Sequence, residues 1–234
     1  MNGEGNMKRI LIFGDSVLKG VYYSGEEGRH RLYRERSGEL ARAGFEVTNN
    51  SVMGATVVTG EELLRRKLTD ALGPEEDRSG TAVILEYGGN DCDYRWQDIS
   101  EDPEGDFLPN TPEETFVSRY RAYIDYVRSA GAAAYLCNLV PLDPERYMAW
   151  ISRDRDRGNI LRWLGDVGRL YRWQAFYSSI AERIAALTDT PLIPVREAFM
   201  ARGRYQDLIS PDGIHPNVEG HRVIDRVLLD ALRG

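Results

Sequence analysis

Cysteine, histidine and long apolar runs are all scarce in this sequence, and each shortage excludes a class of protein. Two cysteines, Cys92 and Cys137, among 234 residues are too few for a disulfide framework. Three histidines, His30, His215 and His221, occur without HExxH or CxxC spacing, so we expect no metal site and no cofactor. No apolar run approaches the roughly 20 residues that span a bilayer, so stable membrane insertion is not expected.

Basic charge and an export signal are also missing. The chain carries 30 Lys and Arg against 37 Asp and Glu, a net charge of −7, whereas a nucleic-acid-binding protein needs a basic surface. Only Ile10–Phe13 is apolar near the start, which is too short for the core of a signal peptide. We therefore predict a cytoplasmic protein that binds no nucleic acid, with residues 1–6 as a loose tail.

Five short apolar runs with β-branched residues predict strands: Lys8–Phe13, Phe45–Asn49, Thr81–Tyr87, Ala132–Val140 and Pro191–Val195. Amphipathic segments between them predict helices at Leu32–Ala43, Glu61–Leu72, about Thr111 to Ser129, and after Pro216. Residues 97–110 are acidic and are predicted to be a loop. Residues 142–188 are rich in Arg, Trp and Tyr and predict at least two further helices.

Strands that alternate with helices predict a mostly parallel five-stranded sheet with helices on both faces. No linker divides the chain, so we predict one domain over residues 1–234, with a helical elaboration at 142–188. In such sheets the ligand lies outside the carboxyl ends of the strands. Chemistry is therefore expected just after a strand.

Two motifs at such positions offer a nucleophile and its base. Gly14, Asp15 and Ser16 directly follow the first predicted strand. Asp212 lies three residues before His215, ahead of the last helix, a spacing that lets a carboxylate hold one imidazole nitrogen and leaves the other free. A serine hydroxyl needs such a base to become a nucleophile. The G-x-S-x-G elbow of ordinary α/β-hydrolases is absent.

Two further strand ends offer groups that donate hydrogen bonds to an anion. Gly88-Gly89-Asn90-Asp91 follows the third predicted strand, and Gly54 follows the second. The side-chain amide of Asn90 and the backbone N–H of Gly54 are suited to a developing oxyanion.

The other two histidines and the aromatic residues fit structural roles as well as functional ones. His30 lies in a polar, Arg-rich stretch and is predicted to be solvated, and His221 is predicted to lie on the surface of the last helix. Aromatic residues crowd the 142–188 segment and the stretches near the motifs. Their spacing is typical of a core or an oligomer contact, while a pocket for acyl chains or a stacking surface for sugars stays open.

Together the four motifs, in the order GDS, G, GxND and DxxH, resemble the SGNH/GDSL hydrolase family from Gly14 to the last helix. The resemblance implies a flavodoxin-like three-layer α/β/α sandwich. It implies Ser16 as nucleophile, Asp212 and His215 as the acid and base of a triad, and oxyanion donors on Ser16, Gly54 and Asn90. Asp15 and Asp91 are assigned supporting roles beside these residues.

The expected function is hydrolysis of small acyl or acetyl esters through an acyl-enzyme on Ser16, with a short acyl ester or an acetylated sugar as substrate. An acyltransferase on the same site is an alternative, as is a module that binds a small carbohydrate or anion without catalysis. A third alternative makes the 142–188 segment a docking surface. The sequence leaves a homo-oligomer open.

Overall fold

A parallel sheet of five strands forms the middle of the computed structural model, which describes residues 8–72, 78 and 80–233. The strands lie in the order β4-β1-β5-β6-β7, and every neighbouring pair is parallel. Their bounds are β1 Arg9–Gly14, β4 Glu46–Asn49, β5 Thr81–Glu86, β6 Ala133–Cys137 and β7 Leu192–Ile193. The predicted α/β/α sandwich is confirmed, while the predicted tail at residues 1–6 lies outside the described residues.

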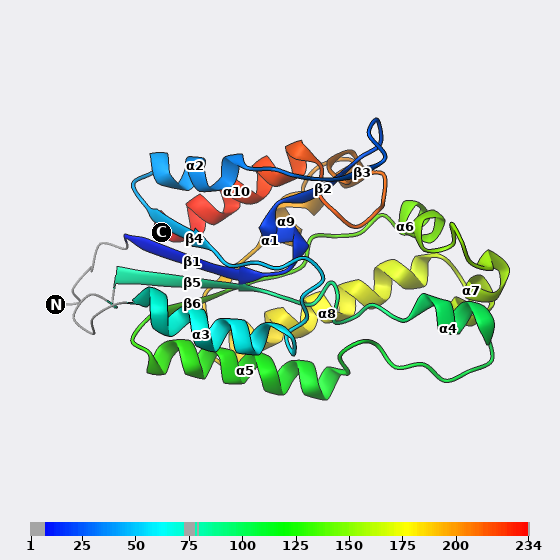
Figure 1. Cartoon of the computed structure of the whole chain (residues 1–234), viewed down its shortest axis with the longest axis horizontal. Coiled ribbons are helices and arrows are strands. Elements are labelled where there is room, and N and C mark those ends of the chain that lie inside the picture. The colour runs from blue at the N-terminus through cyan, green and yellow to red at the C-terminus, as the bar shows by residue number, and fades with distance from the viewer. Residues whose placement is uncertain (1–7, 73–77, 79, 234) are drawn as a thin grey trace.

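Helices cover both faces of this sheet (Figure 1). On one face lie α3 (Gly60–Leu72), α5 (Glu113–Ser129) and α8 (Gly168–Leu187), and on the other α2 (Glu35–Arg42), α9 (Val195–Met200) and α10 (Val218–Arg233). Successive side chains of β1 point to opposite faces, so Leu11 and Phe13 join one buried cluster and Ile10 and Ile12 join the other. Burial on both faces explains why the central strands are continuous apolar runs.

A third group of helices lies beyond the carboxyl ends of the strands (Figure 1). It consists of α4 (Trp96–Glu101), α6 (Pro144–Ile151) and α7 (Arg157–Leu164), which share a buried cluster with the start of α8. The predicted loop at 97–110 is therefore wrong in its first residues, because burial of Trp96 and Ile99 holds them in a helix. The 142–188 segment forms α6, α7 and α8.

Three short elements between β1 and α2 were not predicted. Helix α1 (Ser16–Lys19) directly follows β1, and β2 (Val21–Ser24) pairs antiparallel with β3 (Arg29–Leu32) as a separate hairpin. The hairpin lies at the same end of the sheet as α6 (Figure 1). Close to the last loop, a 3-10 turn covers Tyr205–Leu208.

A buried charged network supports α1 from the side of α2 and α10. Arg36 forms an ion pair with Asp225 at 2.7 Å, and it also donates to the carbonyl of Leu18. His221 accepts from Arg36 at 3.0 Å and donates to the carbonyl of Val21 at 2.9 Å. The prediction of a surface His221 is therefore wrong: burial and the Arg36 charge hold its pKa well below the ordinary value.

Within the described ranges, no helix combines the length and apolar character that crossing a membrane requires.

Candidate active site

Ser16 is presented at the carboxyl end of β1 by a turn that only a glycine fits. A Cβ on Gly14 would lie 2.8 Å from the carbonyl oxygen of Glu86 on β5, so a side chain there would force the two strands apart. Asp15 then caps α1, because its carboxylate accepts the Val17 N–H at 2.8 Å. The close approach of Gly14 to β5 and the cap formed by Asp15 together fix Ser16 as the first residue of α1.

Ser16, His215 and Asp212 form a continuous chain of hydrogen bonds. The Ser16 Oγ lies 2.9 Å from His215 Nε2, although the two residues are 199 positions apart. His215 Nδ1 lies 2.6 Å from Asp212 Oδ2. All three side chains are buried. The structure thus brings together the hydroxyl, imidazole and carboxylate that the sequence analysis singled out.

The loop before α10 holds Asp212 in its ionised form. Its Oδ1 accepts the backbone N–H groups of Ile214 at 3.3 Å and His215 at 3.2 Å. Burial by itself raises a carboxyl pKa, but the hydrogen bonds from the His215 ring and from the backbone N–H groups of His215 and Ile214 outweigh burial here, so the pKa of Asp212 is lowered. An ionised Asp212 can stabilise a positive charge on His215.

Asn90 links the loops that follow β1 and β4. Its Nδ2 donates to Asp15 Oδ2 at 3.0 Å and to the carbonyl of Ala55 at 3.1 Å. The Ala55 N–H closes a turn onto the carbonyl of Val52 at 3.1 Å, with Gly54 at a φ of +77° that favours glycine. Both N–H bonds of the Asn90 side-chain amide therefore already have an acceptor. An oxyanion that accepts from this amide would share a hydrogen with, or replace, Asp15 Oδ2 or the Ala55 carbonyl.

Two buried carboxyl groups lie behind Asn90. Burial raises the pKa of Asp15, and burial together with the nearby Asp15 charge raises the pKa of Glu86 well above its ordinary value. The upward pKa shift is the larger at Glu86, and Asp15 is the carboxyl group that accepts the Asn90 amide. Asp15 lies where a supporting residue was predicted.

Asp91 ties the loop after β5 to the loop that carries Gly54. Its two carboxylate oxygens lie 3.0 and 3.2 Å from the backbone nitrogen of Val57. The side chain is fully buried, and burial raises the pKa of Asp91 to about 7.

This raised pKa predicts a specific pH dependence of stability. A carboxyl whose pKa is higher in the folded state contributes stability that is present below the unfolded pKa, near 3.9, and lost as the pH rises through about 7. The Asp91→Asn protein should therefore lose less stability than the wild type between pH 5 and pH 8, by about a few degrees in Tm. Thermal melts at both pH values measure this. The control Asp70→Asn lies at an exposed position on α3, and its change in Tm between the two pH values should equal that of the wild type. If Asp91→Asn also showed the same change in Tm as the wild type, the raised pKa of Asp91 would be refuted.

A pocket opens beside Ser16, His215 and Asn90 and continues between the helices beyond the sheet. Apolar and aromatic side chains from all four helices of that end line it: Trp96 of α4, Tyr147 of α6, Leu164 of α7, and Leu170 and Trp173 of α8. Asp93, Arg169 and Gln174 also line the pocket. The 142–188 segment therefore supplies one wall of the candidate active site. Aromatic residues there line a pocket as well as fill a core.

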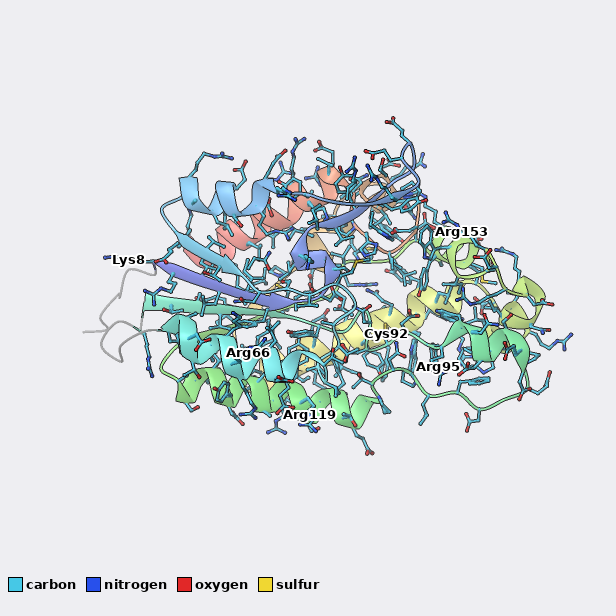
Figure 2. The ribbon with its side chains drawn as sticks, in the orientation of Figure 1. Lys8, Arg66, Cys92, Arg95, Arg119 and Arg153 are labelled. Carbon is cyan, nitrogen blue, oxygen red and sulfur yellow. The ribbon has the colours of Figure 1, made fainter. Side chains whose placement is uncertain are left out.

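The polar atoms of these aromatic side chains are bonded to the protein. Trp96 Nε1 donates to Asp93 at 2.8 Å and lies 3.2 Å from the Tyr147 hydroxyl. Trp173 Nε1 donates to the carbonyl of Cys92 at 2.8 Å, and Figure 2 shows Cys92 beside α8. With these polar atoms occupied, the side chains of Trp96, Tyr147 and Trp173 offer a ligand mainly their carbon atoms.

His30 lies against Asp212, so its predicted solvation is only partly right. His30 Nε2 is 3.2 Å from Asp212 Oδ2, and its side chain is 30% exposed. One ligand atom each from His30, Asp212 and His215 lies within 4.8 Å of the others. These are the described residues that could converge on a metal ion, and the same atoms form the hydrogen bonds given above.

Comparison with solved structures places this fold among lipases and esterases. A lipase/acylhydrolase from Enterococcus faecalis is 16% identical, with a TM-score of 0.64 over 96% of this chain and 94% of that one. A catalytic mutant of an acetylxylan esterase from Geobacillus stearothermophilus is 19% identical, with a TM-score of 0.60 over 96% and 94%. At these identities the likeness shows the fold alone. Among curated protein sequences none matches this chain.

The family assignment rests on the sequence and not on the likeness of fold. The profile of the GDSL-like Lipase/Acylhydrolase family matches residues 12–223. That range begins within β1, before Ser16, and ends within α10, after His215, so it contains every residue of the site described above. The chain belongs to the GDSL-like lipase/acylhydrolase family.

Proposed function

We propose that this protein hydrolyses carboxylic esters through an acyl-enzyme on Ser16. The observation that carries the proposal is the buried chain from Ser16 Oγ to His215 at 2.9 Å and on to Asp212 at 2.6 Å. A serine within hydrogen-bond reach of an imidazole, itself oriented by a carboxylate, is the arrangement that activates a hydroxyl for acyl transfer.

The steps follow from these contacts. Ser16 Oγ attacks the ester carbonyl while His215 Nε2 takes the hydroxyl proton, and Asp212 stabilises the imidazolium that forms. The tetrahedral intermediate collapses, the C–O bond to the alcohol breaks, and His215 returns the proton to the departing alcohol. Water then attacks the acyl-enzyme by the same route, and the acid and free Ser16 are released.

The oxyanion of each tetrahedral intermediate needs donors. We assign the backbone N–H groups of Ser16 and Gly54 and the side-chain amide of Asn90 to this role. Asp15 and Ala55 hold the amide in place, and the oxyanion shares or replaces one of these two acceptors when it accepts from Asn90.

We also propose that the acyl part of the substrate is an apolar chain longer than acetyl. The pocket beside Ser16 ends in a wall of Leu and aromatic side chains whose polar atoms are already bonded. A sugar against this apolar part of the pocket would leave the hydroxyl groups that face it without partners, which is costly. Each buried methylene contributes about 0.8 kcal/mol, about fourfold in kcat/KM.

The experiment is a panel of p-nitrophenyl esters from acetate to octanoate, run beside acetylated sugars. Release of p-nitrophenol by the purified protein, with kcat/KM rising from acetate toward the medium-chain esters, supports the proposal. Product analysis with a competing alcohol separates hydrolysis from transfer of the acyl group. No release from any ester would contradict esterase activity, and a preference for acetylated sugars would contradict the apolar acyl chain.

Filling the pocket should change chain-length preference without removing activity. In Leu170→Trp a larger side chain occupies the apolar wall, so kcat/KM for hexanoate should fall about tenfold or more, because two to three methylenes lose their contacts. The value for acetate should stay within about threefold. Leu187→Trp, at an exposed position at the end of the same helix, is the control. Equal losses on both esters would show that the pocket does not hold the acyl chain.

A further inference from the structure

His30 reaches the candidate active site from an element outside the sheet. It lies on β3 opposite Tyr23 of β2 in the hairpin register. Its ring meets the ring of His215 edge-on, with 5.1 Å between centroids, and its Nε2 lies 3.2 Å from Asp212 Oδ2. The hairpin therefore brings a second imidazole to the carboxylate that holds His215.

His30 adds one hydrogen-bond donor to the Asp212 carboxylate. Oδ1 accepts two backbone N–H groups, from Ile214 and His215. Oδ2 accepts His215 Nδ1 and, on this arrangement, the Nε2–H of His30. Each oxygen then has two donors, which fixes rotation of the carboxylate and places Oδ2 toward His215. Without His30, Oδ2 has one described donor.

The hairpin is held firmly enough for this role. The rings of Tyr23 and Trp150 pack edge-on against His30, with centroids 5.3 and 5.7 Å away. The Tyr23 N–H donates to Ser210 Oγ at 3.3 Å, two residues before Asp212. Arg153 stacks on the Trp150 ring, 3.7 Å from its centroid, beside α6 (Figure 2). The His30 ring thus packs between Tyr23 of the same hairpin and Trp150 of α6, next to Asp212.

We propose that His30 is a positioning residue of the active site. It donates from Nε2 to Asp212, keeps the carboxylate aligned with His215 Nδ1, and acts on the reaction only through Asp212. The inference rests on the proposed function of Ser16 and His215. It assigns a task in the reaction to the β2–β3 hairpin.

The first test compares substitutions at this one position. His30→Phe keeps an aromatic ring between Tyr23 and Trp150 but removes the donor. Its kcat should fall about tenfold, the low end of the range for a hydrogen bond to a charged group, with KM within about twofold. His30→Gln retains an N–H donor and should recover part of the loss. The control Arg29→Phe, which is exposed on the same strand, should behave as the wild type.

A double-mutant cycle then separates positioning from a general structural role. If His30 acts through Asp212, adding His30→Phe to Asp212→Ala should change the rate by less than about twofold. The rate of labelling by a fluorophosphonate can serve as the readout, because it needs no turnover. The same tenfold loss in both backgrounds would overturn the proposal, as would a wild-type kcat for His30→Phe.

The test must also distinguish a metal ion bound by the side chains of His30, Asp212 and His215. Wild-type activity that EDTA removes and a divalent cation restores, with no such response in His30→Phe, would overturn the hydrogen-bond assignment. Failure of the proposed function is distinguished by Ser16→Ala. If that variant is active the function fails, whereas an inactive Ser16→Ala with a fully active His30→Phe removes only the role of His30.

Discussion

Ser16→Ala should lose about 10⁴-fold or more in kcat/KM toward p-nitrophenyl esters, with the fold unchanged. The substitution removes the hydroxyl that lies 2.9 Å from His215 Nε2 and leaves the backbone N–H of residue 16 in place. No acyl-enzyme can then form, and only catalysis by the oxyanion donors and by binding remains. Steady-state kinetics measure the loss, and circular dichroism checks the fold.

A second buried serine provides the control for Ser16→Ala. Ser51 follows β4 and is equally buried, but its Oγ has no hydrogen-bond partner among the described residues. Ser51→Ala should stay within about twofold of the wild type. If Ser16→Ala retained wild-type turnover, the nucleophile would lie elsewhere and the proposed mechanism would be wrong.

Asn90→Ala should lower kcat by about 10²–10³-fold, the usual cost of one oxyanion donor. KM should change little, because the donor is engaged most strongly in the transition state. The loss should apply to short and long acyl esters alike, since the amide acts on the carbonyl oxygen and not on the chain. The kinetics of acetate and hexanoate esters measure both points.

Asn90 also bridges two loops, so its effect on folding needs a separate measurement. Asn159→Ala removes a comparable amide, which donates to the carbonyl of Ser100 at 2.8 Å away from the Ser16 loop, and should leave kcat within about twofold. Thermal melts of both variants separate lost stability from lost catalysis. Turnover near the wild-type level in a folded Asn90→Ala protein would remove Asn90 from the oxyanion site.

The sheet and its loops could be predicted because their signals are local. Residues 82–85 are apolar throughout because β5 is buried on both faces, and Gly14 ends β1 where the chain must turn. Parallel strands bring their carboxyl ends to one edge. That rule alone places the Ser16, Gly54 and Asn90 loops together, and the structure has them there.

The hairpin and its histidine could not be placed as readily. Its sequence contains two short runs around Gly25-Glu26-Glu27-Gly28, which is a hairpin signal, but the polar, Arg-rich stretch around His30 indicates only that this side chain is solvated. The contact of His30 with Asp212 spans 182 positions. No local pattern encodes such a contact.

His221 and the pocket show two other limits. The spacing from His221 to Ile224 and Leu228 puts all three on one face of α10, so its burial could have been predicted from helical periodicity. The pocket wall could not, because α5 and β6 separate α4 from α6, α7 and α8 in sequence, and α4 meets them only in the fold. Aromatic composition alone does not distinguish a core from a pocket.

Labelling with a fluorophosphonate probe tests the central claim most directly. The probe forms a covalent bond to a serine oxygen only when a neighbouring base activates it. At neutral pH we expect one label per chain, located on Ser16 by peptide mass spectrometry, absent in Ser16→Ala and much slower in His215→Ala. A folded wild-type protein that takes no label, or takes it on another serine, would contradict the account.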